Sequence, residues 1–117
     1  MATMMMALPI RAGQTEALRA FAQECMGPRS AANDAAKRRL RISAENWYLL
    51  SCPDGGRFML QIESPDLMSS LSAFIASTEP FVVWYKEQVR ACTGYDFNAG
   101  PPPPEMLAES LVEYKAV

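Results

Sequence analysis

Hydrophobic residues recur at two different spacings along the chain, which indicates a mixture of strands and helices. Residues 4–10 form a short apolar run that ends at the turn-forming residues 11–13, and this is typical of a strand buried on both faces. Over residues 14–26 the apolar positions recur at helical spacing, with charged residues opposite them. Residues 27–28, Gly-Pro, end that predicted helix. A second, alanine-rich helix is expected over residues 30–40, with its first residue, a serine, as the cap.

The middle of the chain predicts a β-hairpin. Residues 46–52 and 57–63 are strand-like runs on either side of residues 53–56, Pro-Asp-Gly-Gly, a strong turn signal. If all four are the loop, Trp47 pairs with Ile62; closing the turn at its two glycines instead shifts the partners by two and leaves every side chain on the same face. The apolar face contains Trp47, Leu49, Ser51, Phe58, Leu60 and Ile62, and the mixed face contains Asn46, Tyr48, Leu50, Cys52, Arg57, Met59, Gln61 and Glu63.

Two more helices and a proline-rich segment are predicted after the hairpin. Ser64 is the expected cap and Pro65 the first helical residue of one helix. The second restarts at Pro80 and ends at Gly94. Residues 95–104 form a linker to the last strand that ends in four prolines, which favour an extended crossing over the surface.

The tail after the linker fits either a helix or a strand. Leu107, Leu111 and Tyr114 have helical spacing, whereas residues 110–114 have the pattern of a strand. The first strand needs a neighbour on each side for its backbone hydrogen bonds, and the hairpin supplies only one. We therefore predict that residues 109–115 form a fourth strand, with Val112 and Tyr114 on one face and Leu111 on the other.

This order of elements predicts an α+β fold of the ferredoxin-like type, βαββαβ, in one domain of residues 1–117. Its four-stranded antiparallel sheet would have the order 4-1-3-2, with all helices on one face, covering the apolar side of the hairpin. The other face keeps Tyr48, Leu50 and Met59, and a monomer rarely leaves an apolar face of this size in water. We expect a homodimer in which two sheets pack face to face through these residues.

Composition narrows the possible chemistry. The 117 residues carry 11 basic and 13 acidic side chains and no histidine, which excludes a Ser-His-Asp triad, a Cys-His dyad and a histidine-ligated haem. Cys25, Cys52 and Cys92 lack the spacing of a metal or redox motif. They predict reduced thiols in a cytoplasmic protein with no metal site and no cofactor. The apolar start is too short to span a membrane, and no membrane partner is expected.

The densest charge run, residues 37–41, contains four basic side chains. The acidic overall balance and the absence of interleaved aromatic residues argue against nucleic acid as a partner. A solvated helix end is the better interpretation, because cations are favourable at the negative end of the helix dipole. Pairing with Glu105, Glu109 or Glu113 is a further alternative.

Four polar residues of the mixed hairpin face are candidate pocket residues: Asn46, Tyr48, Gln61 and Glu63. In a dimeric barrel they would line a cavity, where a carboxylate such as Glu63 can have a raised pKa and act as a base. Alternatively, they lie at the mouth of the barrel and hydrogen-bond to each other or to water. Trp84 is the fifth candidate, although an aromatic stripe at helical spacing is also typical of a core or a dimer contact.

The chain resembles a family of small uncharacterised bacterial ferredoxin-like proteins within the dimeric α+β barrel superfamily. The resemblance spans most of the chain and is carried mainly by residues at turns and at the ends of helices and strands, with no catalytic signature. The stretches concerned are Leu8-Pro9-Ile10, Gly27-Pro28-Arg29, Arg38-Arg39, residues 77–84 around Pro80-Phe81, Gly94-Tyr95-Asp96 and residues 101–105. Wider relatives include cofactor-free monooxygenases, haem-degrading enzymes, lactone isomerases and ligand-sensing domains, so the resemblance implies a dimer and leaves the activity open.

Two functions from different classes follow from the sequence. The first is a dimeric barrel that binds an apolar small molecule or a partner without catalysis, because no nucleophile lies beside a base in any motif. The second is a cofactor-independent enzyme of the monooxygenase or isomerase type, with a pocket between sheet and helices.

Overall fold

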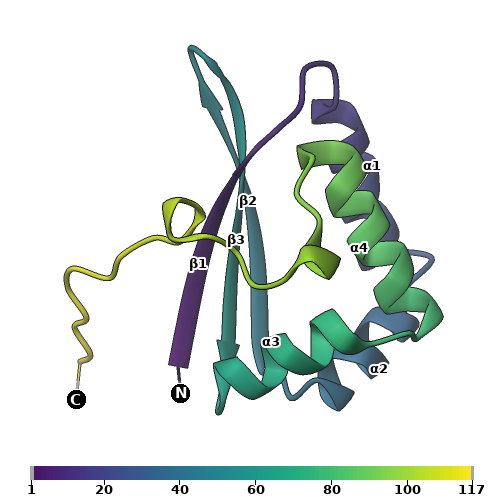
Figure 1. Cartoon of the computed structure of the whole chain (residues 1–117), viewed down its shortest axis with the longest axis vertical. Helices are drawn as coiled ribbons and strands as arrows, with labels where there is room; N and C mark the ends of the chain where they lie inside the picture. Colours follow the sequence, from purple (N-terminus) through teal and green to yellow (C-terminus); the bar gives the residue numbers. More distant parts are fainter. Residues whose placement is uncertain (1, 117) are drawn as a thin grey trace.

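A computed structural model describes residues 2–116 and shows one antiparallel sheet with four helices on one of its faces (Figure 1). The elements in chain order are β1 (Ala2–Pro9), α1 (Thr15–Met26), α2 (Ser30–Arg39), β2 (Ala44–Cys52), β3 (Gly55–Ser64), α3 (Leu67–Ala76), α4 (Pro80–Thr93) and the short 3₁₀ helices η1 (Phe97–Ala99) and η2 (Pro104–Met106). The α+β class and the placement of the four α-helices on one face of the sheet are as predicted.

The sheet of the described chain has three strands in the order β1-β3-β2, and the prediction of a fourth strand is wrong. The proline-rich segment does bring the chain back to the free edge of β1, where Leu107 forms a single antiparallel bridge with Met6. The Ala108 N–H donates to the carbonyl of Met5 at 2.8 Å, and beyond that point the chain leaves the sheet.

Register limits how far the tail could continue as a strand. Each step beyond the Met6–Leu107 bridge pairs a later tail residue with an earlier residue of β1, so that Leu111 would face Ala2, the first residue of the strand. Nothing in β1 remains to pair with Val112 or Tyr114. Residues 109–116 are accordingly exposed, with Val112 at 84% and Tyr114 at 87%.

The β2–β3 hairpin has the predicted faces but a different register. Cys52 pairs with Gly55 across a loop of only Pro53 and Asp54, so Trp47 faces Leu60. The glycines belong to the strand, and all partners are shifted by two relative to a four-residue loop. An even shift keeps each side chain on its face, so the predicted division into an apolar and a mixed face holds.

The core lies between the apolar sheet face and the helices. Met6 and Leu8 of β1 are fully buried beside Phe58 and Leu60 of β3. The helices contribute a connected set of aromatic rings at edge-to-face or tilted angles, in which Tyr85 of α4 packs at 5.2 to 6.3 Å from its neighbours. Such ring pairs add specificity to the burial of apolar area.

Side chains at the helix ends determine how the helical layer sits on the sheet. Ser64 was predicted to cap α3, but Asp66 is the residue whose carboxylate accepts from the N–H of Ser69. Lys86 of α4 is buried, and its ammonium donates to the carbonyls of Ile75 and Ser77 at 2.9 and 3.1 Å, at the C-terminal end of α3. This cation therefore joins α3 to α4 at a helix end that favours positive charge.

Neither helix of this pair, nor any other single helix within residues 2–116, has the length and hydrophobicity to cross a membrane. Within residues 2–116, only α3 and α4 taken together, with a bend of 93° between them, have the length and composition of a membrane-spanning segment.

Candidate functional site

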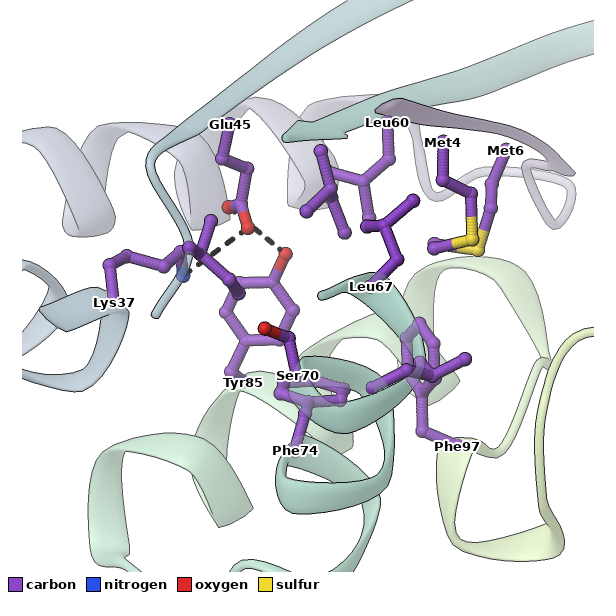
Figure 2. Close-up of a pocket in the computed structure, with 13 residues that line it drawn as sticks. Met4, Met6, Lys37, Glu45, Leu60, Leu67, Ser70, Phe74, Tyr85 and Phe97 are labelled. Carbon is purple, nitrogen blue, oxygen red and sulfur yellow. Dashed lines mark hydrogen bonds and ion pairs between the residues drawn. The ribbon is translucent and has the colours of Figure 1, made fainter. Parts of the chain in front are cut away.

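A small cavity lies between the sheet and the helical layer (Figure 2). Its walls are mainly apolar side chains of β1, β3, α3 and η1: Met4, Met6, Leu60, Ile62, Leu67, Leu71, Phe74 and Phe97, with Ile42 from the segment before β2. Its volume is about 30 Å³, which is room for one or two water molecules. Four polar residues also reach it: Lys37, Glu45, Ser70 and Tyr85.

Glu45 is the centre of the polar end. It lies on β2 two residues before Trp47, so strand alternation points both side chains toward the helices. Its Oε2 accepts hydrogen bonds from Trp47 Nε1 at 2.9 Å and from the Tyr85 hydroxyl at 3.2 Å. Figure 2 shows the second of these bonds. Two donors from different elements therefore hold one carboxylate oxygen in place.

Lys37 of α2 faces the other oxygen of this carboxylate. Its Nζ lies 3.4 Å from Glu45 Oε1, donates to Asn33 Oδ1 at 2.9 Å, and lies 4.7 Å from the centre of the Tyr85 ring. The Lys37 and Glu45 side chains are only 15% and 11% exposed. Removing either partner of such a pair leaves an uncompensated charge in a mostly buried place.

Burial determines the protonation state of two neutral groups near this pair. It raises the pKa of Tyr85 well above its usual range, and the negative charge of Glu45 adds to the effect. The phenol therefore stays protonated at neutral pH and acts as a hydrogen-bond donor. Burial likewise raises the pKa of Cys25 to about 11, so this thiol is not ionised and is a poor nucleophile.

A larger groove lies on the outer side of the same ion pair. It has a volume of about 750 Å³ and runs between α1, α2 and the start of β2, within the size range of small-molecule sites. Cys25, Met26 and Trp47 supply apolar surface, and Asn33 and Asn46 supply amide groups. Lys37, Ile42 and Glu45 line both the groove and the cavity.

The structure brings together four of the five pocket residues predicted from the sequence, but away from the cavity. Asn46 pairs directly with Gln61, and Tyr48 and Glu63 lie on the same helix-free face of the sheet. Of the five, only Asn46 reaches the cavity or the groove in the described chain. Trp84 lies apart on α4, where the Arg29 guanidinium stacks 4.0 Å from its ring centre.

Sequence reasoning missed Lys37, Glu45 and Tyr85, each for a different reason. Glu45 lies one residue before the predicted strand, although a charged residue at a core-facing position was the available signal. Lys37 opens the basic run that was interpreted as solvated, yet Asn33 lies one turn before it and faces the same way. Tyr85 belongs to the aromatic stripe assigned to the core.

Comparisons with known proteins support the fold. No family matches the sequence, and no curated protein does. Among solved structures, the chain is similar to tetracenomycin F2 cyclase from Streptomyces glaucescens, described as a type-II polyketide cyclase, with 16% identity, a TM-score of 0.57 and coverage of 100% of both chains. The likeness supports a ferredoxin-like α+β fold.

Proposed function

We propose that the protein is a homodimer that binds a small, neutral, largely apolar molecule carrying one hydroxyl group, at the polar end formed by Glu45 and Lys37. The observation that supports it is the mostly buried ion pair at the meeting point of an apolar cavity and a groove of about 750 Å³. Ligand sites are typically apolar hollows with few, well-placed polar groups.

The charges at this site favour a neutral ligand. A ligand carboxylate that pairs with Lys37 would also lie beside Glu45, and a ligand ammonium that pairs with Glu45 would also lie beside Lys37, so each ionic ligand meets a like charge. A hydroxyl group can donate to Glu45 Oε1, since Trp47 and Tyr85 already occupy Oε2, and it can accept from Lys37 at the same time.

Two compounds of matched shape test this proposal, 1-naphthol and naphthalene, in displacement of the neutral fluorophore N-phenyl-1-naphthylamine. The wild type is expected to prefer the naphthol by about tenfold, because a hydrogen bond to a charged group contributes about 1.5 kcal/mol or more. Glu45→Gln should lose most of that preference and keep its affinity for naphthalene. Equal binding of the two compounds by the wild type would contradict the proposal.

The exposed face of the sheet supports the dimer. Tyr48 and Leu50 are 53% and 48% exposed there, and Met59 pairs with Tyr48 on the same face. The tail adds Leu111 and Tyr114, both more than 80% exposed. A second copy of the chain would bury these side chains, and a two-fold axis makes one apolar face complementary to itself.

An acid–base enzyme is the second candidate function, favoured by the contact between the Glu45 carboxylate and the Tyr85 phenol. In this mechanism Glu45, held by the Tyr85 hydroxyl that donates to it, takes a proton from carbon, and the Lys37 ammonium stabilises the oxyanion that forms. The test is exchange of the C1 protons of 2-tetralone in D₂O, followed by NMR: Glu45 would remove a proton and return a deuteron. Exchange no faster than in Glu45→Gln would rule out this function.

A further inference from the structure

The groove and the cavity meet at one ion pair. Lys37 and Glu45 line both, and their charged ends lie between the outer hollow and the inner one. We infer that the Lys37–Glu45 pair is a gate, and that groove and cavity are the outer and inner parts of one binding site which a ligand enters from the groove. The inference rests on the proposed function and adds to it the route of entry.

The pair can separate because each partner has other contacts. Its N···O distance of 3.4 Å is longer than the bonds around it. When the pair opens, Lys37 keeps its 2.9 Å bond to Asn33 and its place over the Tyr85 ring. Glu45 keeps its bonds from Trp47 and Tyr85. Neither charge is left without a polar neighbour while the gate is open.

Along its own length the helix that carries Lys37 buries few side chains, and its anchor is Leu40 directly after it, which is buried and whose carbonyl accepts from the Ser70 hydroxyl. In α2 only Ala36 is buried, and small side chains bury little apolar area. Its remaining links to the body include the exposed ion pair between Arg39 and Glu79. Just beyond the helix, Arg41 has a φ of 61°, an uncommon left-handed conformation for a residue other than glycine, which turns the chain sharply toward β2. Movement of α2 away from β2 would widen the groove and draw Lys37 from Glu45.

The difference in size between the groove and the cavity is the reason that a ligand would have to pass the ion pair. A cavity of about 30 Å³ does not hold a naphthalene-sized molecule as it stands, whereas the adjoining groove is large enough. A ligand whose hydroxyl group reaches the ion pair from the groove would need the pair to part before its ring enters between β3 and α3. The ion pair is therefore expected to limit the rates of entry and exit.

Stopped-flow fluorescence with N-phenyl-1-naphthylamine tests the gate, because a gate and a ligand contact change the rate constants differently. Lys37→Met keeps an aliphatic chain over the tyrosine ring and removes the ion pair. We expect it to raise the association rate constant threefold or more, because the gate no longer has to open, whereas the loss of a ligand contact alone would raise only the dissociation rate constant. Asn33→Ala removes the competing partner of Lys37 and should lower both rate constants, and alanine at this helical position also favours folding.

Arg19→Met is the matched control, since it also removes one cation from a helical ion pair, with Glu16, and Arg19 lines neither the groove nor the cavity. It should leave both rate constants at the wild-type values. Unchanged rates in Lys37→Met and Asn33→Ala, or a change in dissociation alone, would overturn the gate while leaving the binding function standing. Failure of the wild type to bind the fluorophore saturably would overturn the binding function and the gate with it.

Discussion

Replacing Glu45 by glutamine tests how far the polar end of the site contributes to the fold. The substitution keeps the size of the side chain and one oxygen acceptor but removes the negative charge. Trp47 and Tyr85 can still donate to the amide oxygen, whereas the ammonium of Lys37 loses its counter-ion.

The expected loss of stability follows from these contacts. A hydrogen bond to a charged group contributes about 1 kcal/mol more than one to a neutral group, and two donors converge on Glu45 Oε2. Removing one partner of a buried ion pair costs about 3–5 kcal/mol, but here Lys37 keeps its bond to Asn33. We therefore expect Glu45→Gln to lower the free energy of unfolding by about 3 kcal/mol.

Urea unfolding measures this loss, provided that the m-value stays constant. In a double-mutant cycle with Lys37→Met, the coupling free energy between the two sites should be about 1–2 kcal/mol. Glu16→Gln is the control, because its ion pair with Arg19 is exposed and should contribute less than about 0.5 kcal/mol. A loss below about 1 kcal/mol for Glu45→Gln, or no coupling to Lys37, would refute this account of the site.

Four further predictions concern the rest of the molecule. At micromolar concentration the protein should sediment at twice its monomer mass of 12.9 kDa, and Leu50→Lys should give a monomer or an unfolded chain. A wild-type monomer would contradict the dimer. Ending the chain after Ala108 should weaken the dimer about tenfold or more, because about 1.4 kcal/mol of apolar burial corresponds to that factor; unchanged sedimentation would mean that the tail lies outside the interface. Lys86→Met should destabilise the fold by about 2 kcal/mol in urea, since two carbonyls lose their donor. The pKa of Cys25 is raised from 9.0 to about 11. The free energy of unfolding should therefore be unaffected by this thiol below pH 9 and should fall as the pH rises from 9 to 11, because the unfolded chain loses the proton first. In Cys25→Ala the urea midpoint should fall less over the same pH range.

The fold was largely predictable because local patterns and backbone hydrogen bonding agree over most of the chain. The turn signal at residues 53–56 identified the hairpin, and Pro80 and Gly94 mark the two ends of α4 as predicted. The prediction of a fourth strand was wrong because it depended on the register between the tail and β1, which no local sequence pattern specifies. The tail meets β1 at Met6, and that register leaves too little of the strand to pair with it.

The candidate site was less predictable because it depends on contacts between distant segments. Lys37 and Glu45 are only eight residues apart, but Tyr85 joins them from a helix forty residues beyond Glu45. From the sequence pattern alone, a lysine in a basic run is expected to be solvated, and a tyrosine in an aromatic stripe is expected to lie in the core. Only the packing of α2 and α4 over β2 shows that the two side chains share one carboxylate.

The two tryptophans provide the most direct test of binding at Glu45. The indole N–H of Trp47 donates to this carboxylate, whereas Trp84 contacts Arg29 and is separated from Trp47 by the ring of Phe21. In ¹H–¹⁵N spectra of the protein titrated with 1-naphthol, the Trp47 indole signal should shift saturably and the Trp84 signal should stay in place. A Trp47 signal that does not move when binding is saturated would contradict the proposed site.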